Sequence, residues 1–93
     1  MINATIRQRL VEETRDVQTK EIITWLYRDH PQGASSEGIK ETLFLHDAFE
    51  ESSLTRLVEQ GVLIFDGKRY QVSPVPRQIL DRDPTILLDE FLR

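Results

Sequence analysis

The chain has 93 residues, of which 39% are hydrophobic and 30% charged, and its formal net charge is −4. This length allows one small domain with a thin core, which terminal helices or a partner must complete. Because cysteine is absent, a disulfide framework and a thiolate metal site are excluded. No apolar run approaches the roughly 18 residues of a membrane span, and the first residues lack a secretory apolar segment. We therefore expect a cytoplasmic protein with no membrane partner.

The negative charge is concentrated in the middle of the chain. Residues 31–61 hold two basic and six acidic side chains, whereas residues 1–30 hold five of each. Such an acidic segment argues against a protein whose main task is to coat nucleic acid.

Two helices are predicted in the first third of the chain. Asn3 can cap a helix over residues 1–18 that is amphipathic, with a sparse apolar stripe of Ile2, Ile6, Leu10 and Val17. This helix could lie against the domain or pair with a second copy of itself. Thr19 then suits the N-cap of a second helix, which Pro31 ends. Its broad buried face consists of Ile22, Ile23, Leu26 and Tyr27.

The next segment is predicted to form a helix, a turn and a second helix. Ser35 or Ser36 begins the first of these, with Ile39, Leu43 and Phe44 turned inward. After a turn at residues 45–47, Asp47 and Glu50 form a capping box for a helix over residues 47–60, which Gly61 ends. The inward side chains of this helix are Phe49, Leu54, Leu57 and Val58.

A β-hairpin is predicted over residues 62–72. Residues 62–65 are β-branched, aliphatic and aromatic, Asp66-Gly67 is a two-residue turn signal, and Tyr70 and Val72 alternate on the returning strand. Beyond it, the prolines in residues 73–76 predict an extended segment, and residues 77–80 a helical turn. Asp83 and Pro84 then open a last helix that is too apolar to stay solvated, with Ile86, Leu87, Leu88, Phe91 and Leu92.

The string SLTRLVEQGVLIFDGKRYQVSP, residues 53–74, resembles the closing pattern of the winged-helix family: recognition helix, glycine, strand, wing turn and aromatic return strand. With the two preceding helices, the resemblance covers residues 19–74. It implies an α+β, mainly α fold, a winged helix-turn-helix with a three-helix core and a β-hairpin wing. Residues 1–18 and 75–93 are then additional N- and C-terminal helical segments around the winged-helix domain.

If the chain binds DNA as this family typically does, the helix 47–60 enters the major groove and the hairpin 62–72 reaches the backbone. Ser52, Thr55 and Arg56 then face base edges or phosphates, and Lys68 and Arg69 contact phosphates. The three cations among these residues also have an interpretation that does not involve DNA. Arg56 could be a solvated arginine paired with its helix neighbours, and the two hairpin cations could simply keep an edge strand soluble.

Catalytic and metal sites are not predicted. The sequence has no P-loop, no dinucleotide glycine motif and no Gly-x-Ser-x-Gly. His30 and His46 have no ligand at a metal-like helical spacing, so both are expected in turns or at helix ends. We therefore expect a protein that is not an enzyme and needs no cofactor.

The apolar terminal helices predict a homodimer in which Ile6, Leu10, Leu87, Leu88 and Phe91 form the interface. The alternative is a monomer whose last helix packs beside Ile6 and Leu10.

Two functions of the chain remain open. The first is a winged-helix DNA-binding protein, a small transcriptional regulator that binds double-stranded DNA. The second is a winged-helix protein–protein interaction module, a non-enzymatic subunit of a larger complex that does not bind DNA.

Overall fold

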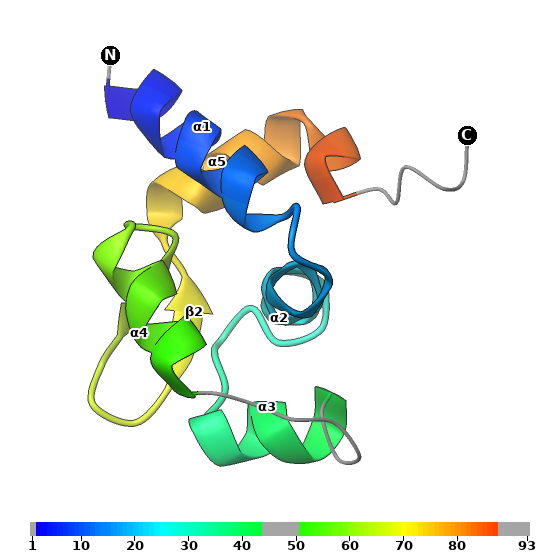
Figure 1. Cartoon of the computed structure of the whole chain (residues 1–93), viewed down its shortest axis with the longest axis vertical. Helices are drawn as coiled ribbons and strands as arrows, with labels where there is room; N and C mark the ends of the chain where they lie inside the picture. The colour runs from blue at the N-terminus through cyan, green and yellow to red at the C-terminus, as the bar shows by residue number, and fades with distance from the viewer. Residues whose placement is uncertain (1, 44–50, 88–93) are drawn as a thin grey trace.

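The computed structural model describes residues 2–43 and 51–87. In chain order these form α1 (Ile2–Glu13), α2 (Val17–Arg28), α3 (Ser36–Leu43), α4 (Glu51–Glu59), β1 (Leu63–Phe65), β2 (Tyr70–Val72), α5 (Pro74–Arg82) and a short 3-10 helix, η1 (Pro84–Leu87). The helices surround a single antiparallel hairpin, and α1 crosses α5 at one end of the molecule (Figure 1). The expected α+β, mainly α class is confirmed.

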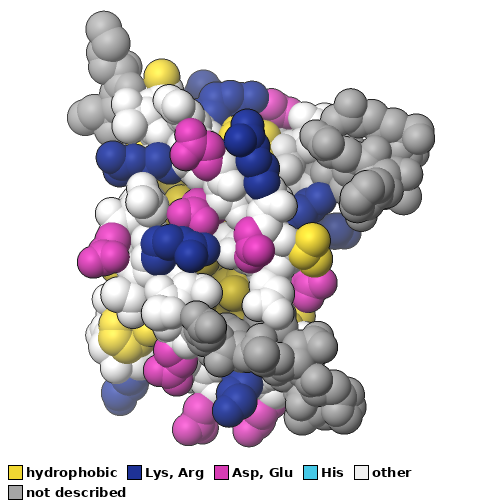
Figure 2. All heavy atoms as spheres, in the orientation of Figure 1, with side chains coloured by type: hydrophobic (Ala, Val, Ile, Leu, Met, Phe, Trp, Pro, Cys, Tyr) yellow, Lys and Arg dark blue, Asp and Glu magenta, His cyan; other side chains and the backbone are white. Residues whose placement is uncertain are grey.

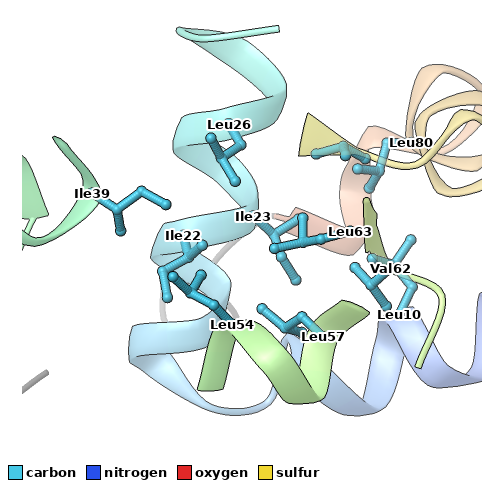
Figure 3. Close-up of a cluster of buried hydrophobic side chains, with 11 residues drawn as sticks. Leu10, Ile22, Ile23, Leu26, Ile39, Leu54, Leu57, Val62, Leu63 and Leu80 are labelled. Carbon is cyan, nitrogen blue, oxygen red and sulfur yellow. The ribbon is translucent and has the colours of Figure 1, made fainter. Parts of the chain in front are cut away.

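One apolar cluster holds the described elements together. Charged side chains are scattered over the face seen in Figure 2, whereas the apolar side chains converge from the helices and the hairpin in Figure 3. Leu10 of α1 and Leu80 of α5 belong to the same cluster as the side chains of α2 and α4, so the terminal helices complete the core. The cluster consists of Leu10, Ile22, Ile23, Leu26, Ile39, Leu54, Leu57, Val62, Leu63, Val72 and Leu80.

The start of α2 differs from the sequence prediction. Asp16, in an extended conformation, is the N-cap, and its Oδ2 accepts hydrogen bonds from the Thr19 backbone N–H at 2.9 Å and the Thr19 hydroxyl at 2.8 Å. Thr19 is therefore a buried first-turn residue and not the cap. Val17 begins α2 and is 66% exposed, so it does not continue the apolar stripe of α1. Asn3 lies inside α1, which begins at Ile2.

The hairpin loop is longer than predicted. Phe65 pairs with Tyr70, so four residues, 66–69, separate the strands. Because the Asp66 N–H donates to the Arg69 carbonyl at 3.2 Å, Gly67 and Lys68 lie at the tip in place of the predicted Asp66-Gly67. The cause is the Asp66 carboxylate, whose Oδ1 accepts from the backbone N–H groups of Lys68 at 2.9 Å and Arg69 at 2.8 Å. An aspartate that bonds the backbone in this way stabilises a wider loop.

A second contact fixes the hairpin to the segment before α3. Ala34 and Tyr70 form an isolated bridge, in which the Ala34 N–H donates to the Tyr70 carbonyl at 3.0 Å and the Tyr70 N–H donates back at 2.8 Å. Gly33 makes this approach possible with a φ of +101°. β2 is therefore flanked by β1 on one side and Ala34 on the other.

The segment after the hairpin is helical and not extended as predicted. Ser73 is the N-cap of α5 and Pro74 its first residue. Proline is tolerated there because first-turn N–H groups have no partner within the helix. Pro76 removes the N–H that a serine cap bonds at the third position, and the buried Ser73 hydroxyl has no partner within the described chain.

α5 is joined to the N-terminal helices by polar contacts. Arg7 of α1 forms an ion pair with Asp83 at 2.5 Å, and the Tyr27 hydroxyl of α2 donates a hydrogen bond to Asp81. This bond to Asp81 raises the pKa of the Tyr27 hydroxyl. Asp83, predicted to open the last helix, is the C-cap of α5, and Pro84 begins the 3-10 helix η1. The predicted helix residues Leu88, Phe91 and Leu92 lie outside the described residues.

Candidate nucleic-acid interface

The helix predicted for base recognition corresponds to α4. Leu54 and Leu57 are fully buried, as their spacing indicates, and Ser52, Thr55 and Arg56 share the exposed face because they are three and four residues apart. The predicted capping residues Asp47 and Glu50, the predicted core residue Phe49 and the turn at residues 45–47 lie outside the described residues.

Arg56 is engaged within the chain. Its Nη2 lies 3.1 Å from Glu13 Oε1, and the same atom donates to the Thr19 hydroxyl at 3.3 Å. The positive charge of Arg56 also lowers the pKa of Asp16, after the larger effects of the two hydrogen bonds from Thr19. The guanidinium thus joins α4 to the junction of α1 and α2, while 47% of its side chain stays exposed.

The exposed surface of α4 is not uniformly basic. Glu51 lies in its first turn and Glu59 at its end, both exposed. In Figure 2, basic and acidic groups alternate over the face in view and do not merge into one basic surface. Carboxylates next to a phosphate backbone weaken binding, so α4 alone is a poor anion-binding surface.

The hairpin tip, residues 66–69, differs from α4 in its charge. Lys68 and Arg69 are exposed, and neither side chain forms an ion pair with any described residue. The backbone N–H groups of Arg69 and Lys68 lower the pKa of Asp66, which therefore stays ionised and keeps the loop in shape. Two cations and one carboxylate give the tip an excess of positive charge.

Two large apolar side chains beside the tip were not singled out by the sequence. Ile64 is 45% exposed and Phe65 47% exposed, although both belong to the apolar run that predicts the first strand of the hairpin. The Phe65 ring stacks on Tyr70 with centroids 4.4 Å apart and planes 23° apart. Hydrophobic and basic groups lie close together over the hairpin at the lower left of Figure 2.

The predicted dimer residues are only partly available. Leu10 is 0% exposed in the core of its own chain, so it cannot contact a second copy in this conformation. Ile6 is partly buried and lies over Gly61, and Leu87 packs against the core. Leu88 and Phe91 lie outside the described residues. The homodimer stays a prediction, and Leu10 is removed from its interface.

Metal-binding groups do not converge in the described part of the chain: residues 2–43 and 51–87 contain no set of three or more His, Asp or Glu placed to hold an ion. His30 lies against Trp25 with ring centroids 4.1 Å apart, and His46 is outside the described residues. Among the described helices, none has the length and apolar character needed to cross a membrane.

Comparisons with protein-family models, with curated proteins and with solved structures found no match.

Proposed function

We propose that the chain is a winged-helix DNA-binding protein, a small transcriptional regulator that contacts double-stranded DNA through the hairpin and α4. The observation that supports this most directly is the hairpin tip, where Lys68 and Arg69 are exposed and lack intramolecular ion pairs among the described residues. Exposed cations that form no close ion pair with the described residues can replace the counterions of a phosphate backbone.

The order of elements supports the same proposal. α2, α3 and α4 are followed directly by the hairpin, and the bridge from Ala34 fixes the hairpin to the segment before α3. In the winged-helix resemblance, α4 is the recognition helix and the hairpin is the wing. β1 packs beside α4 and runs back along it, which brings the loop toward the N-terminal end of that helix (Figure 1).

Because Arg56 is paired with Glu13, the hairpin cations supply the first contacts in this proposal, and Ser52 and Thr55 follow on α4. Two phosphate contacts give a slope of about −2 in a plot of log K against log salt concentration. Fluorescence anisotropy of a labelled duplex at several salt concentrations measures this slope.

Charge reversal tests the residues. Lys68→Glu with Arg69→Glu should abolish duplex binding, whereas Arg28→Glu with Lys40→Glu should weaken it only slightly. The control pair is also exposed, and both double variants change the net charge by the same amount. Equal losses in the two double variants would contradict a local contact at the hairpin.

The second candidate is a winged-helix protein–protein interaction module that does not bind DNA. It is favoured by the acidic ends of α4 and by the ion pair that engages Arg56. Under this function, the duplex stays unbound even at about 50 mM salt and tens of micromolar protein, where non-specific DNA contacts are normally visible.

Self-association is tested separately. Under the proposed homodimer, which Ile6 and Leu87 would help to form, the sedimentation coefficient rises with protein concentration. A monomer mass at all concentrations would exclude it.

A further inference from the structure

Phe65 is an exposed aromatic residue at the end of β1, next to the hairpin loop. Nearly half of the residue, 47%, is accessible, although its strand neighbour Leu63 is fully buried. Exposing a phenyl ring to water has a free-energy cost that burial would remove. An occupant for this ring must therefore offer an apolar surface.

The ring is held in place from beneath. Tyr70 stacks on it at 4.4 Å and is itself partly buried, and the Tyr70 backbone exchanges two hydrogen bonds with Ala34. The register that sets Phe65 opposite Tyr70 is fixed further by the bond from the Asp66 N–H to the Arg69 carbonyl at 3.2 Å. A preorganised ring loses little conformational entropy when a second ring stacks on it.

The charges beside the ring indicate which flat, apolar group fits. Lys68 and Arg69 follow Phe65 in the same loop, and the Asp66 carboxylate is occupied by their backbone N–H groups. A nucleotide combines a flat π-face with a phosphate, and single-strand binding sites combine aromatic rings with nearby cations. A purely apolar partner would leave the cations of Lys68 and Arg69 without a contact, and an acidic partner without a flat apolar group would leave the Phe65 ring exposed.

From these contacts we propose that the hairpin binds single-stranded nucleic acid, stacking an unpaired base on Phe65 while Lys68 and Arg69 contact the adjacent phosphates. A duplex cannot fill this site without unstacking, because the faces of its bases are covered by their neighbours. The inference is therefore independent of the proposed duplex binding, and either can fail without the other.

The probes are fluorescein-labelled twelve-residue oligomers of deoxythymidine and of uridine, titrated with the full chain at about 50 mM salt. Phe65→Leu should lower the affinity about 5- to 150-fold, the range that corresponds to about 1–3 kcal/mol for one base–aromatic stack. Phe65→Tyr keeps an aromatic ring and should bind within about twofold of the unaltered chain. The two oligomers separate a general single-strand site from one that selects DNA or RNA.

Ile64→Ala is the matched control, because Ile64 is the adjacent residue and is 45% exposed, close to the 47% of Phe65. It should change affinity by less than about twofold, since an aliphatic side chain supplies no π-face. Circular dichroism and thermal unfolding of each variant establish that the hairpin is intact.

Tight binding by the unaltered chain, a loss in Phe65→Leu and retention in Phe65→Tyr and Ile64→Ala would support the proposal. It would be overturned if neither oligomer bound, or if Phe65→Leu and Ile64→Ala had equal effects. Single-strand binding that depends on Phe65, without duplex binding, would leave this inference standing and reject the proposed function.

Discussion

Gly33→Ala should destabilise the protein by far more than a loop substitution normally does. Gly33 lies just before the bridge between Ala34 and Tyr70, with a φ of +101°. A side chain at this φ costs about 1–2 kcal/mol. The added Cβ would also lie 2.7 Å from Gln71 Cγ and 3.1 Å from the Tyr70 carbonyl oxygen.

These two neighbours respond differently to the added methyl group. The Gln71 side chain can rotate away, but its amide then gives up the 3.1 Å hydrogen bond to the Gln32 carbonyl, with a net cost of about 1 kcal/mol. The Tyr70 carbonyl oxygen is backbone, and it accepts the hydrogen bond from the Ala34 N–H. Strain and lost hydrogen bonding together give about 2–4 kcal/mol for Gly33→Ala.

Gly67→Ala separates the backbone strain at positive φ from the clash of the added Cβ. Gly67 has nearly the same φ, +100°, but nothing lies within 4 Å of its added Cβ, so only the backbone cost of about 1–2 kcal/mol applies. Urea unfolding can be followed through Trp25, the one tryptophan in the sequence, which contacts the core. Equal losses of unfolding free energy in both variants would refute the clash at Gly33.

Two further predictions concern the polar junction between α1, α2 and α4. Glu13→Gln should release Arg56 and, under the proposed function, tighten duplex binding. The control Glu12→Gln removes the same charge but no ion pair to Arg56, so it should tighten binding less. Equal changes in duplex affinity, measured by fluorescence anisotropy, would contradict this prediction. Asp16→Ala should cost about 1 kcal/mol of unfolding free energy through the lost cap, whereas Asp16→Asn keeps a good cap and removes the charge. Because the hydrogen bonds from Thr19 lower the pKa of Asp16 below 3.8, its ionised form contributes stability above that pH, and the contribution disappears as pH falls through the folded-state pKa. The difference in unfolding free energy between the unaltered chain and Asp16→Asn should therefore shrink in acid; a constant difference across pH would refute the assignment.

Local periodicity was sufficient to predict the buried faces. Ile22, Ile23 and Leu26 of α2, and Leu54 and Leu57 of α4, are buried as their spacing indicates. Each prediction depends on residues three and four apart, and that geometry is fixed by the helix itself. The position of the hairpin follows from a different local signal, the apolar run of residues 62–65 followed by Asp66-Gly67 and the alternation of Tyr70 and Val72.

Side chains that bond the backbone produced the local errors. Asp66 stabilises a four-residue loop where Asp-Gly suggests a two-residue turn, and Asp16 caps α2 in place of Thr19. The prolines of residues 73–76 predict an extended segment, although Pro74 occupies the first position of α5. At Asp66 and Asp16 the choice between two acceptable local structures is decided by two hydrogen bonds to the aspartate, whereas at Pro74 it is decided by the helix position that the proline occupies.

The candidate site was predicted less completely because its main contacts are distant in sequence. No spacing rule connects Arg56 with Glu13, or Ala34 with Tyr70. The exposure of Phe65 follows from its position near the end of a short edge strand, which an apolar run of residues does not reveal.

Because α1 and α5 contribute to the same core, the order of synthesis determines when that core can form. Leu10 leaves the ribosome early, but the Leu80 side chain of the same cluster and the Asp83 partner of Arg7 are added about 70 residues later, several seconds at about 5–20 residues per second. Until then α1 exposes its apolar side and cannot complete the core. We expect nascent chains that end before α5 to stay sensitive to protease, and the fold to close only when α5 has been made.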